Sequence, residues 1–286
     1  MLTKILHDPN GIVSKLIFED GDAIWETVAY RHENRGVVCF SVQSGCRVGC
    51  VFCGTGKNFI RDLTTEEMKQ QVDEALAIIG EREDIQLMCM SMGEPMDNWN
   101  SVRDYAGSLD ELFREKNPWA FFVSTVGLND ERVWQDFVRM GKIIKRFGLQ
   151  ISLHQWNETK RFTLLGKFPK LMSISDLRES GTFWTKACKK PCYWNYICFG
   201  NETDEDAAEV HRICRGMHVT CSVLCDTSQA AKADPTPAIE FANKLLALGD
   251  IDVSVFDPAG QDTIGGGCGQ LLYVQEKLTR NKNGKT

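Results

Sequence analysis

Long apolar segments, linkers and repeats are missing from this sequence of 286 residues. No apolar run approaches the ~18 residues of a membrane-spanning helix, and residues 1–11 contain no apolar stretch long enough for a signal peptide. Proline is scarce, with 8 residues, and neither a Pro- or Ser-rich linker nor a low-complexity tract divides the chain. These absences argue against a membrane protein and against disorder, and they favour a globular protein of the cytoplasm.

The sequence also has no excess of positive charge. It contains 33 Lys and Arg and 39 Asp and Glu, which gives a net charge of −6. A uniformly basic nucleic-acid-binding protein is therefore excluded. The distribution is uneven, since residues 131–190 hold 13 basic and 5 acidic residues, a local charge of +8, and the rest of the chain carries −14. This asymmetry indicates either a basic face on an acidic body or ordinary solvated helix surfaces.

Strand-like and helix-like segments alternate along most of the chain. Two β-rich runs separated by Glu19-Asp20-Gly21-Asp22 predict an N-terminal hairpin over 12–18 and 24–30. Thr64 and Glu67 form a capping box before a helix at 65–79. Seven runs predict strands at 37–43, 85–91, 119–125, 149–153, 192–199, 218–224 and 251–256, with further helices near 99–116, 130–147, 170–188, 204–216 and 236–248.

Alternating strands and helices predict right-handed βαβ units and a parallel sheet. Six consecutive units favour an α/β fold that is an open, partial (β/α)6 barrel. We expect a short N-terminal β extension over residues 1–35, the partial barrel over 36–280 and a tail over 281–286.

Cysteine is abundant, with 12 residues, and its spacing indicates an inorganic centre. Cys46, Cys50 and Cys53 lie within eight positions, in a Gly-rich loop that follows the strand at 37–43. A structural zinc site needs four protein ligands, and no fourth Cys or His is near. Three thiolates on a [4Fe-4S] cluster leave one iron open to a ligand, and we predict such a cluster here. Cys188, Cys192 and Cys198 could suggest a second cluster, but their alternation favours core packing, and Cys89, Cys214 and Cys221 are expected in the interior.

The cysteine motif, placed after the first barrel strand, resembles that of the radical S-adenosylmethionine (SAM) superfamily. The resemblance extends to one branch, the RlmN/Cfr family of RNA adenine methyltransferases, whose motifs occur here in the same order between Glu26 and Leu272: Cys39–Cys46, Met92–Pro95, Ser124–Gly127, Ser152–His154 and Cys268–Leu271. It implies a [4Fe-4S] cluster and SAM as cofactors, an rRNA or tRNA substrate and a flavodoxin-like reductant, with the chain acting as a monomer.

Polar residues follow the C-terminal ends of several predicted strands, where βα barrels build their ligand sites. A ligand with an amino group, a carboxylate, a ribose and an adenine needs dispersed polar partners of this kind. By resemblance these positions bind SAM, and Glu94 is the expected acceptor for its ammonium group. The expected SAM site comprises Gly93, Glu94, Ser124, Ser152, Leu153, His154 and Asp226. Cys225-Asp226 stands where the family usually has an Asn. The sequence departs from the family pattern here, and the resemblance does not define the contacts of this position with SAM.

The resemblance assigns the methyl transfer itself to three residues. Cys268 follows three glycines, and the matching cysteine of the family is first methylated by one SAM and then loses a hydrogen atom from that methyl group to a 5′-deoxyadenosyl radical made from a second SAM. The resulting methylene radical adds to an adenine carbon. Cys39 matches a cysteine that forms a transient disulfide with the methyl-carrying one, and Glu26 matches a general base.

We therefore expect a radical SAM methyltransferase that acts at carbon 2 of an RNA adenine, with carbon 8 as the alternative. Two other functions stay open. The same methyl-cysteine chemistry could act on a peptide, nucleotide or small molecule, because the family usually has an additional N-terminal domain and only about 25 residues precede Glu26 here. Alternatively, the chain could be a non-catalytic Fe-S or zinc protein that binds RNA or senses redox state.

Overall fold

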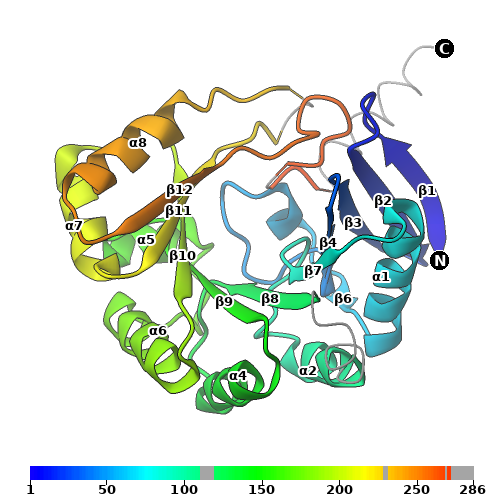
Figure 1. Ribbon diagram of the computed structural model, residues 1–286, viewed down its shortest axis with the longest axis horizontal. Helices are drawn as coiled ribbons and strands as arrows, with labels where there is room; N and C mark the ends of the chain where they lie inside the picture. Colours follow the sequence, from blue (N-terminus) through cyan, green and yellow to red (C-terminus); the bar gives the residue numbers. More distant parts are fainter. Residues whose placement is uncertain (110–118, 228–230, 268, 272–286) are drawn as a thin grey trace.

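A computed structural model shows one curved sheet with helices on its outer side (Figure 1). It describes residues 1–109, 119–227, 231–267 and 269–271. The sheet contains, in spatial order, β1 (Leu2–His7), β2 (Val13–Asp20), β3 (Ala23–Arg31), β4 (Arg35–Cys39), β7 (Asp84–Cys89), β8 (Ala120–Thr125), β9 (Phe147–Ser152), β10 (Cys192–Cys198), β11 (His218–Val223) and β12 (Asp252–Phe256).

The pairing of the strands changes once across the sheet, from antiparallel to parallel. β1 to β4 pair antiparallel, and every pair from β4 to β12 is parallel. The connections between consecutive parallel strands contain the helices α1 (Thr65–Ile79), α2 (Trp99–Ser108), α4 (Glu131–Ile143), α6 (Ile174–Cys188), α7 (Asp204–Cys214) and α8 (Thr236–Ala247). The predicted α/β partial barrel is confirmed. Because β3 pairs with β4, the N-terminal extension continues the barrel sheet instead of forming a separate layer.

The first crossover helix begins where the sequence predicts it. The Oγ1 of Thr64 accepts a hydrogen bond from the backbone N–H of Glu67 at 3.2 Å, and the Glu67 carboxylate accepts one from the N–H of Thr64 at 2.8 Å. This box satisfies donors that the first turn cannot pair internally. Met68, Val72 and Ile79 then bury one face of α1 against the sheet.

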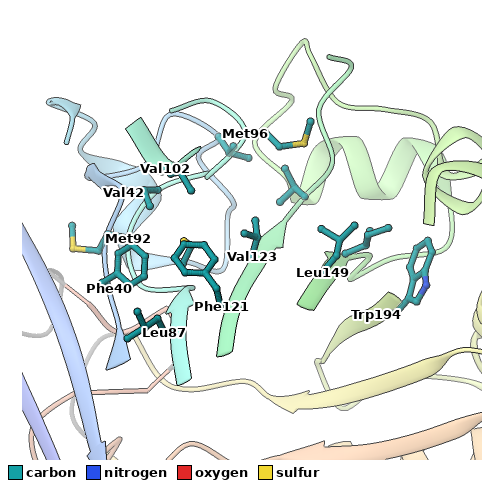
Figure 2. Packing of buried hydrophobic residues seen from close by; sticks show 14 of the residues in the cluster. Phe40, Val42, Leu87, Met92, Met96, Val102, Phe121, Val123, Leu149 and Trp194 are labelled. Carbon is teal, nitrogen blue, oxygen red and sulfur yellow. The ribbon is translucent and has the colours of Figure 1, made fainter. Parts of the chain in front are cut away.

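Apolar side chains fill the space between the sheet and its helices (Figure 2). Phe121, Leu149 and Trp194 come from three different strands, Phe40 directly follows β4, and all four are fully buried. The alternating residues of β10, from Cys192 to Cys198, belong to this core, as does Cys221, so the expectation of core packing for them is confirmed. Among the described residues, no helix is both long and apolar enough to cross a membrane.

Several element boundaries differ from the prediction. The strand expected over 37–43 ends at Cys39. The N–H of Phe40 still donates to the carbonyl of Met88 on β7 at 2.9 Å, but that of Ser41 donates to the side chain of Gln71 at 2.8 Å, which ends the strand pairing. β1 was not expected at all. Short elements also lie at β5 (Gln43–Ser44), the 3-10 turn Gly54–Lys57, β6 (Arg61–Asp62) and α5 (Glu158–Leu164). The predicted tail, residues 281–286, lies outside the described residues.

Candidate active site

The three motif cysteines lie in a loop between β5 and the 3-10 turn, inside the curve of the sheet (Figure 1). Cys46, Cys50 and Cys53 are all half-buried. The loop is anchored at its centre, where the N–H of Val51 donates to the carbonyl of Leu164 at 2.9 Å. Gly166 comes so close to this loop that a Cβ there would stand 2.3 Å from the carbonyl oxygen of Val48.

The electrostatics of these thiols fit a cluster with positive charge. Burial, together with the neighbouring Cys53 and Glu94, raises the pKa of Cys46 to about 12. Burial and the two other thiols likewise place the pKa of Cys50 well above its usual range. Three thiolates this close repel one another unless bound iron compensates their charge. Within the described part of the chain, no group of three donors surrounds one metal ion. A cubane cluster does not require that, because each thiolate binds a different iron.

Glu94 is buried at the carboxyl end of the parallel strands. Its carboxylate accepts hydrogen bonds from the backbone N–H groups of Met96 and Val126, each at 3.0 Å, and from the hydroxyl of Thr125. Burial raises the pKa of Glu94 to about 7 despite these donors. An ammonium group that reached this carboxylate would offset its desolvation, which suits the expected role of Glu94.

Gly93 permits the turn that leads to Glu94. Its φ of +100° lies in a region that favours glycine, and a Cβ would stand 2.7 Å from the side chain of Gln43. The amide of Gln43 accepts a hydrogen bond from the N–H of Glu94 at 3.1 Å and donates to Asp62 and Asp97. Gln43 therefore joins the loop after β4 to the predicted SAM site.

A row of polar side chains crosses the inner face of the sheet from β8 to β11. The hydroxyl of Ser124 donates to Gln150 at 3.1 Å and lies 3.3 Å from the hydroxyl of Ser152. Asn195, paired in register with Ser152, donates to Ser222 at 2.8 Å. Ser124 and Ser152 were predicted, and Gln150, Asn195 and Ser222 were missed. The missed signal was the alternation of these polar residues with fully apolar ones along each strand.

His154 follows the end of β9 in a left-handed conformation, with a φ of +57°. It is 8% exposed, and its Nδ1 accepts a hydrogen bond from the N–H of Ile197 at 3.2 Å. Burial, together with the charge of Arg161, lowers the pKa of His154 to about 3. The imidazole is therefore neutral at physiological pH, and its other ring nitrogen is a hydrogen-bond donor.

Arg161, on α5, holds the ends of β8 and β9 together. Only 1% of it is exposed, and its guanidinium donates to the carbonyls of Ser152, Leu153 and Val126 and to that of Met172. Burial lowers its pKa to about 10, so it remains charged. No sequence pattern indicates this role, because an arginine on a short helix looks like an ordinary solvated residue.

The predicted catalytic residues Glu26 and Cys39 lie on neighbouring strands. Cys39 pairs in register with Val28 of β3, two residues from Glu26, so both side chains are on one face. Glu26 is fully buried, and its carboxylate lies 3.3 Å from the ammonium of Lys15, which is itself 1% exposed. Burial raises the pKa of Cys39 to about 12. Lys15 was missed, because a lysine in a strand usually faces solvent.

Cys268 lies outside the described residues, but the residues on either side of it contact the site. The carbonyl of Gly265 accepts a hydrogen bond from Lys15 at 3.2 Å. The carbonyl of Gly269 accepts one at 2.8 Å from the N–H of Gly54, which follows the last cluster cysteine. A Cβ on Gly267 would stand 2.7 Å from the sulfur of Cys225. The glycine-rich loop, residues 265–267, thus lies between the cluster loop and β2.

The side chain of Gln270 links the glycine-rich loop to two other segments. Its side-chain oxygen accepts a hydrogen bond from the N–H of Gly267 at 2.9 Å, and its amide donates to the backbone carbonyls of Asp226 at 2.8 Å and Gln261 at 3.1 Å. Asp226 therefore takes part through its backbone, and the segment after β11 is joined to the segment around position 268.

The basic residues of the segment 131–190 do not form a single face. Lys142 and Lys186 lie in the last turns of α4 and α6, at the end of the barrel where the parallel strands begin. Lys160 and Lys167 are exposed at the opposite end, after β9, beside the candidate site. Of the two interpretations of this charge excess, a single basic face is not observed for these four lysines, because they lie at both ends of the barrel.

Comparison with known proteins agrees with this geometry. The Radical SAM superfamily model matches residues 40–214. A protein of Myxococcus xanthus named dual-specificity RNA methyltransferase RlmN 1 is 30% identical over 95% of this chain and 76% of its own length. The chain belongs to the radical SAM superfamily and, within it, to the RlmN family. A Dictyoglomus turgidum relative named probable dual-specificity RNA methyltransferase RlmN is 28% identical over 96% of this chain and 80% of its own.

The crystal structure of a radical SAM methyltransferase from Sphaerobacter thermophilus has the same fold. Its TM-score is 0.78 at 28% identity, and the match covers 94% of this chain and 80% of that one. This RlmN-family chain is accordingly a SAM-dependent methyltransferase with a [4Fe-4S] cluster and SAM as its cofactors. When bound, the cluster supplies the electron for the cleavage of SAM.

Proposed function

We propose that this enzyme methylates an unactivated adenine carbon of RNA, carbon 2 in the first place and carbon 8 as the alternative. Cys268 receives the methyl group and transfers its carbon to the adenine. Glu26 accepts the proton that leaves the substrate carbon, and Cys39 forms a disulfide with Cys268 that releases the product. A flavodoxin-like protein of the cytoplasm supplies the electrons, the RNA is an rRNA or a tRNA, and the chain acts as a monomer.

The contacts on both sides of Cys268 carry this proposal. Gly265 is bonded to Lys15 beside Glu26, and Gly269 is bonded to Gly54 beside the cluster loop. A thiol at position 268 needs to reach the cluster side for methylation and the Glu26 side for proton transfer, and its neighbours span these two places. A protein that only binds RNA or senses redox state would not need this arrangement.

The state of Cys39 suits a thiol that reacts late. Burial raises its pKa to about 12, so at neutral pH it is protonated and a poor nucleophile. A premature disulfide with Cys268 would block methylation, and the protonated thiol avoids it. The thiol becomes reactive only when the substrate adduct changes its surroundings.

Exposed groups at the site end of the barrel support RNA as the substrate. Lys160 and Lys167 are exposed there, and Phe162 between them is 43% exposed. Lysines provide salt-dependent contacts to phosphates, and an exposed aromatic ring offers a surface on which a base can stack.

The decisive experiment traps the covalent intermediate. We expect Cys39→Ala, incubated with SAM, reductant and total RNA, to accumulate protein crosslinked to RNA, because the adduct forms but is not released. Cys268→Ala should form no adduct. Cys188→Ala is the matched control, since Cys188 is also half-buried but lies at the end of α6, and it should turn over without trapping RNA.

Two other outcomes would change the proposal in different ways. A peptide or small-molecule adduct of Cys39→Ala, without RNA, would keep the chemistry and overturn the RNA substrate. Cleavage of SAM without any adduct would overturn the methyl-cysteine mechanism for this enzyme.

A further inference from the structure

A buried lysine joins the candidate general base to the glycine-rich loop. The Nζ of Lys15 lies 3.3 Å from the Oε2 of Glu26, and these side chains are 1% and 0% exposed. The same Nζ donates a hydrogen bond to the carbonyl oxygen of Gly265 at 3.2 Å. In Figure 1 the orange segment after β12 passes close to β2 and β3, which brings these distant parts of the chain together. One ammonium group therefore contacts both β3 and the loop that leads to Cys268.

Stability alone gives a poor explanation for this ion pair. Lysine and glutamate are rarely buried unless they are paired, and a buried pair is often no more stabilising than apolar residues of similar volume. The neighbours of Lys15 on its own side of β2, Val13 and Ile17, are apolar and buried. An apolar residue at position 15 would therefore suit the packing of the strand, and the charge needs another reason.

The register of the sheet places Lys15 among the reacting groups. Lys15 pairs with Val28 of β3, and Val28 pairs with Cys39 of β4, so Lys15 and Cys39 share one row across three strands. Glu26 lies two residues from Val28 on the same face. The fixed backbone of three paired strands thus holds the lysine, the carboxylate and the thiol in one relative arrangement.

We propose that Lys15 is a positioning residue that holds the Glu26 carboxylate at a fixed distance from the loop 265–267. This inference rests on the proposed function, because it requires Glu26 to take a proton from the substrate carbon that is joined to Cys268. In that step Glu26 gains the proton, and the electron pair of the broken C–H bond stays on the substrate. The ammonium of Lys15 contacts both sides, so the base and the loop carrying the adduct keep their alignment while the proton moves.

The first experiment needs no substrate. Hydrogen–deuterium exchange of the loop 265–267 is compared between the parent, Lys15→Met and Lys4→Met, each with its cluster in place. Lys4 lies on β1 and is exposed, so it is the matched control. We expect faster exchange in the loop only for Lys15→Met. Equal exchange in all three proteins would overturn the contact between Lys15 and the loop, whatever the substrate is.

The second experiment follows the reaction in stages, with RNA whose adenines carry deuterium at the reacting carbon. Lys15→Met should still cleave SAM and methylate Cys268, but should form product about 10-fold more slowly or worse, because a general base contributes roughly 10²- to 10⁴-fold when it is well placed. The deuterium isotope effect should rise, since proton transfer becomes slower than the other steps. Lys15→Arg should restore most of the rate. A purely structural role would leave the isotope effect unchanged.

A double variant covers the case in which Lys15→Met does not fold. Lys15→Met combined with Glu26→Gln leaves no buried charge without a partner, so it should fold even where Lys15→Met alone does not. Its rate is compared with that of the Glu26→Gln single variant. We expect these two to form product at rates within about two-fold of each other, because Lys15 acts through Glu26. A further loss of about 10-fold in the double variant would overturn the positioning role.

The same data separate this inference from the proposed function. If the parent methylates no RNA, the RNA assignment falls, and the exchange experiment still decides whether Lys15 holds the loop. If the parent methylates RNA but Lys15→Met has lost the methylation of Cys268 as well, Lys15 is needed for the whole site and the inference is wrong.

Discussion

The ring of Phe52 meets the imidazole of His154 edge-on, with the ring centroids 5.2 Å apart. Phe52 lies between the cluster cysteines Cys50 and Cys53, and His154 follows the end of β9. This contact joins the cluster loop to the carboxyl end of the sheet. Since His154 is neutral and buried, the contact is one between two uncharged rings.

Replacing His154 should change how stability depends on pH. Burial lowers the pKa of His154 to about 3 in the folded protein, whereas the unfolded chain takes up a proton near pH 6.5. The contribution of His154 to the free energy of unfolding is therefore fully present above pH 6.5, and it is lost as the pH falls from 6.5 toward 3. For His154→Asn, we expect the slope of the unfolding free energy against pH, between pH 5 and 6, to be shallower by up to ~1.4 kcal/mol per unit. Asn tolerates the left-handed backbone at this position.

Anaerobic urea unfolding at several pH values measures this slope. A slope equal to that of the parent would show that His154 is protonated in the folded protein.

The three cluster cysteines should be individually essential. Cys46→Ala, Cys50→Ala and Cys53→Ala should each abolish the cleavage of SAM, because each thiolate binds a different iron. Anaerobic reconstitution of the parent should give close to four irons per chain, together with broad visible absorption. Cys188→Ala should keep both the iron and the cleavage. Persistent SAM cleavage in all three variants would refute the cluster assignment.

Arg161→Met should destabilise the fold and weaken SAM binding together. Removing the guanidinium takes a donor from four backbone carbonyls, of which that of Leu153 keeps the N–H of Gln155. We expect a loss of about 3 kcal/mol in the free energy of unfolding, since each unsatisfied buried group costs ~1–3 kcal/mol. Urea unfolding and equilibrium dialysis with SAM measure the two effects. Arg178→Met, an exposed change on α6, should stay within about 0.5 kcal/mol of the parent. Equal stability of both variants would remove the bracing role of Arg161.

RNA binding should depend on the lysines at one end of the barrel. Lys160→Ala with Lys167→Ala should weaken RNA binding and reduce the slope of log Kd against log salt by about 1.4 to 1.8, or ~0.7–0.9 per phosphate contact. Lys142→Ala with Lys186→Ala removes the same charge at the opposite end, and should leave binding close to that of the parent. The reverse pattern would place the RNA at the wrong end for the proposed reaction.

Local signals predicted the barrel well. The helix α1 begins and ends where its capping box and apolar spacing predict, because these signals lie within the helix itself. The alternation of strands and helices also predicted the order of the parallel strands. β4 is shorter than expected because Ser41 bonds to the side chain of Gln71, a residue 30 positions away whose contribution cannot be seen locally.

The site was predicted only in part, for a related reason. Glu94, His154 and the cluster cysteines lie in motifs, whereas Lys15 and Arg161 are defined by partners outside their own strand or helix. Lys15 reaches Gly265 across 250 positions. A charged residue in a strand or on a short helix is normally assigned to the surface, and only the tertiary structure shows that each of these two is buried against backbone carbonyls.

The side chain that closes the turn around position 268 is an amide. Gln270 binds Gly267, Asp226 and Gln261 through groups that carry no net charge and do not titrate. Buffer composition and ionic strength should therefore leave the back of this turn unchanged, while its front, held by an ammonium group, responds to the charge on a carboxylate. The described residues on the two sides of position 268 are therefore held by two kinds of contact, an uncharged amide on one side and a buried ammonium group on the other.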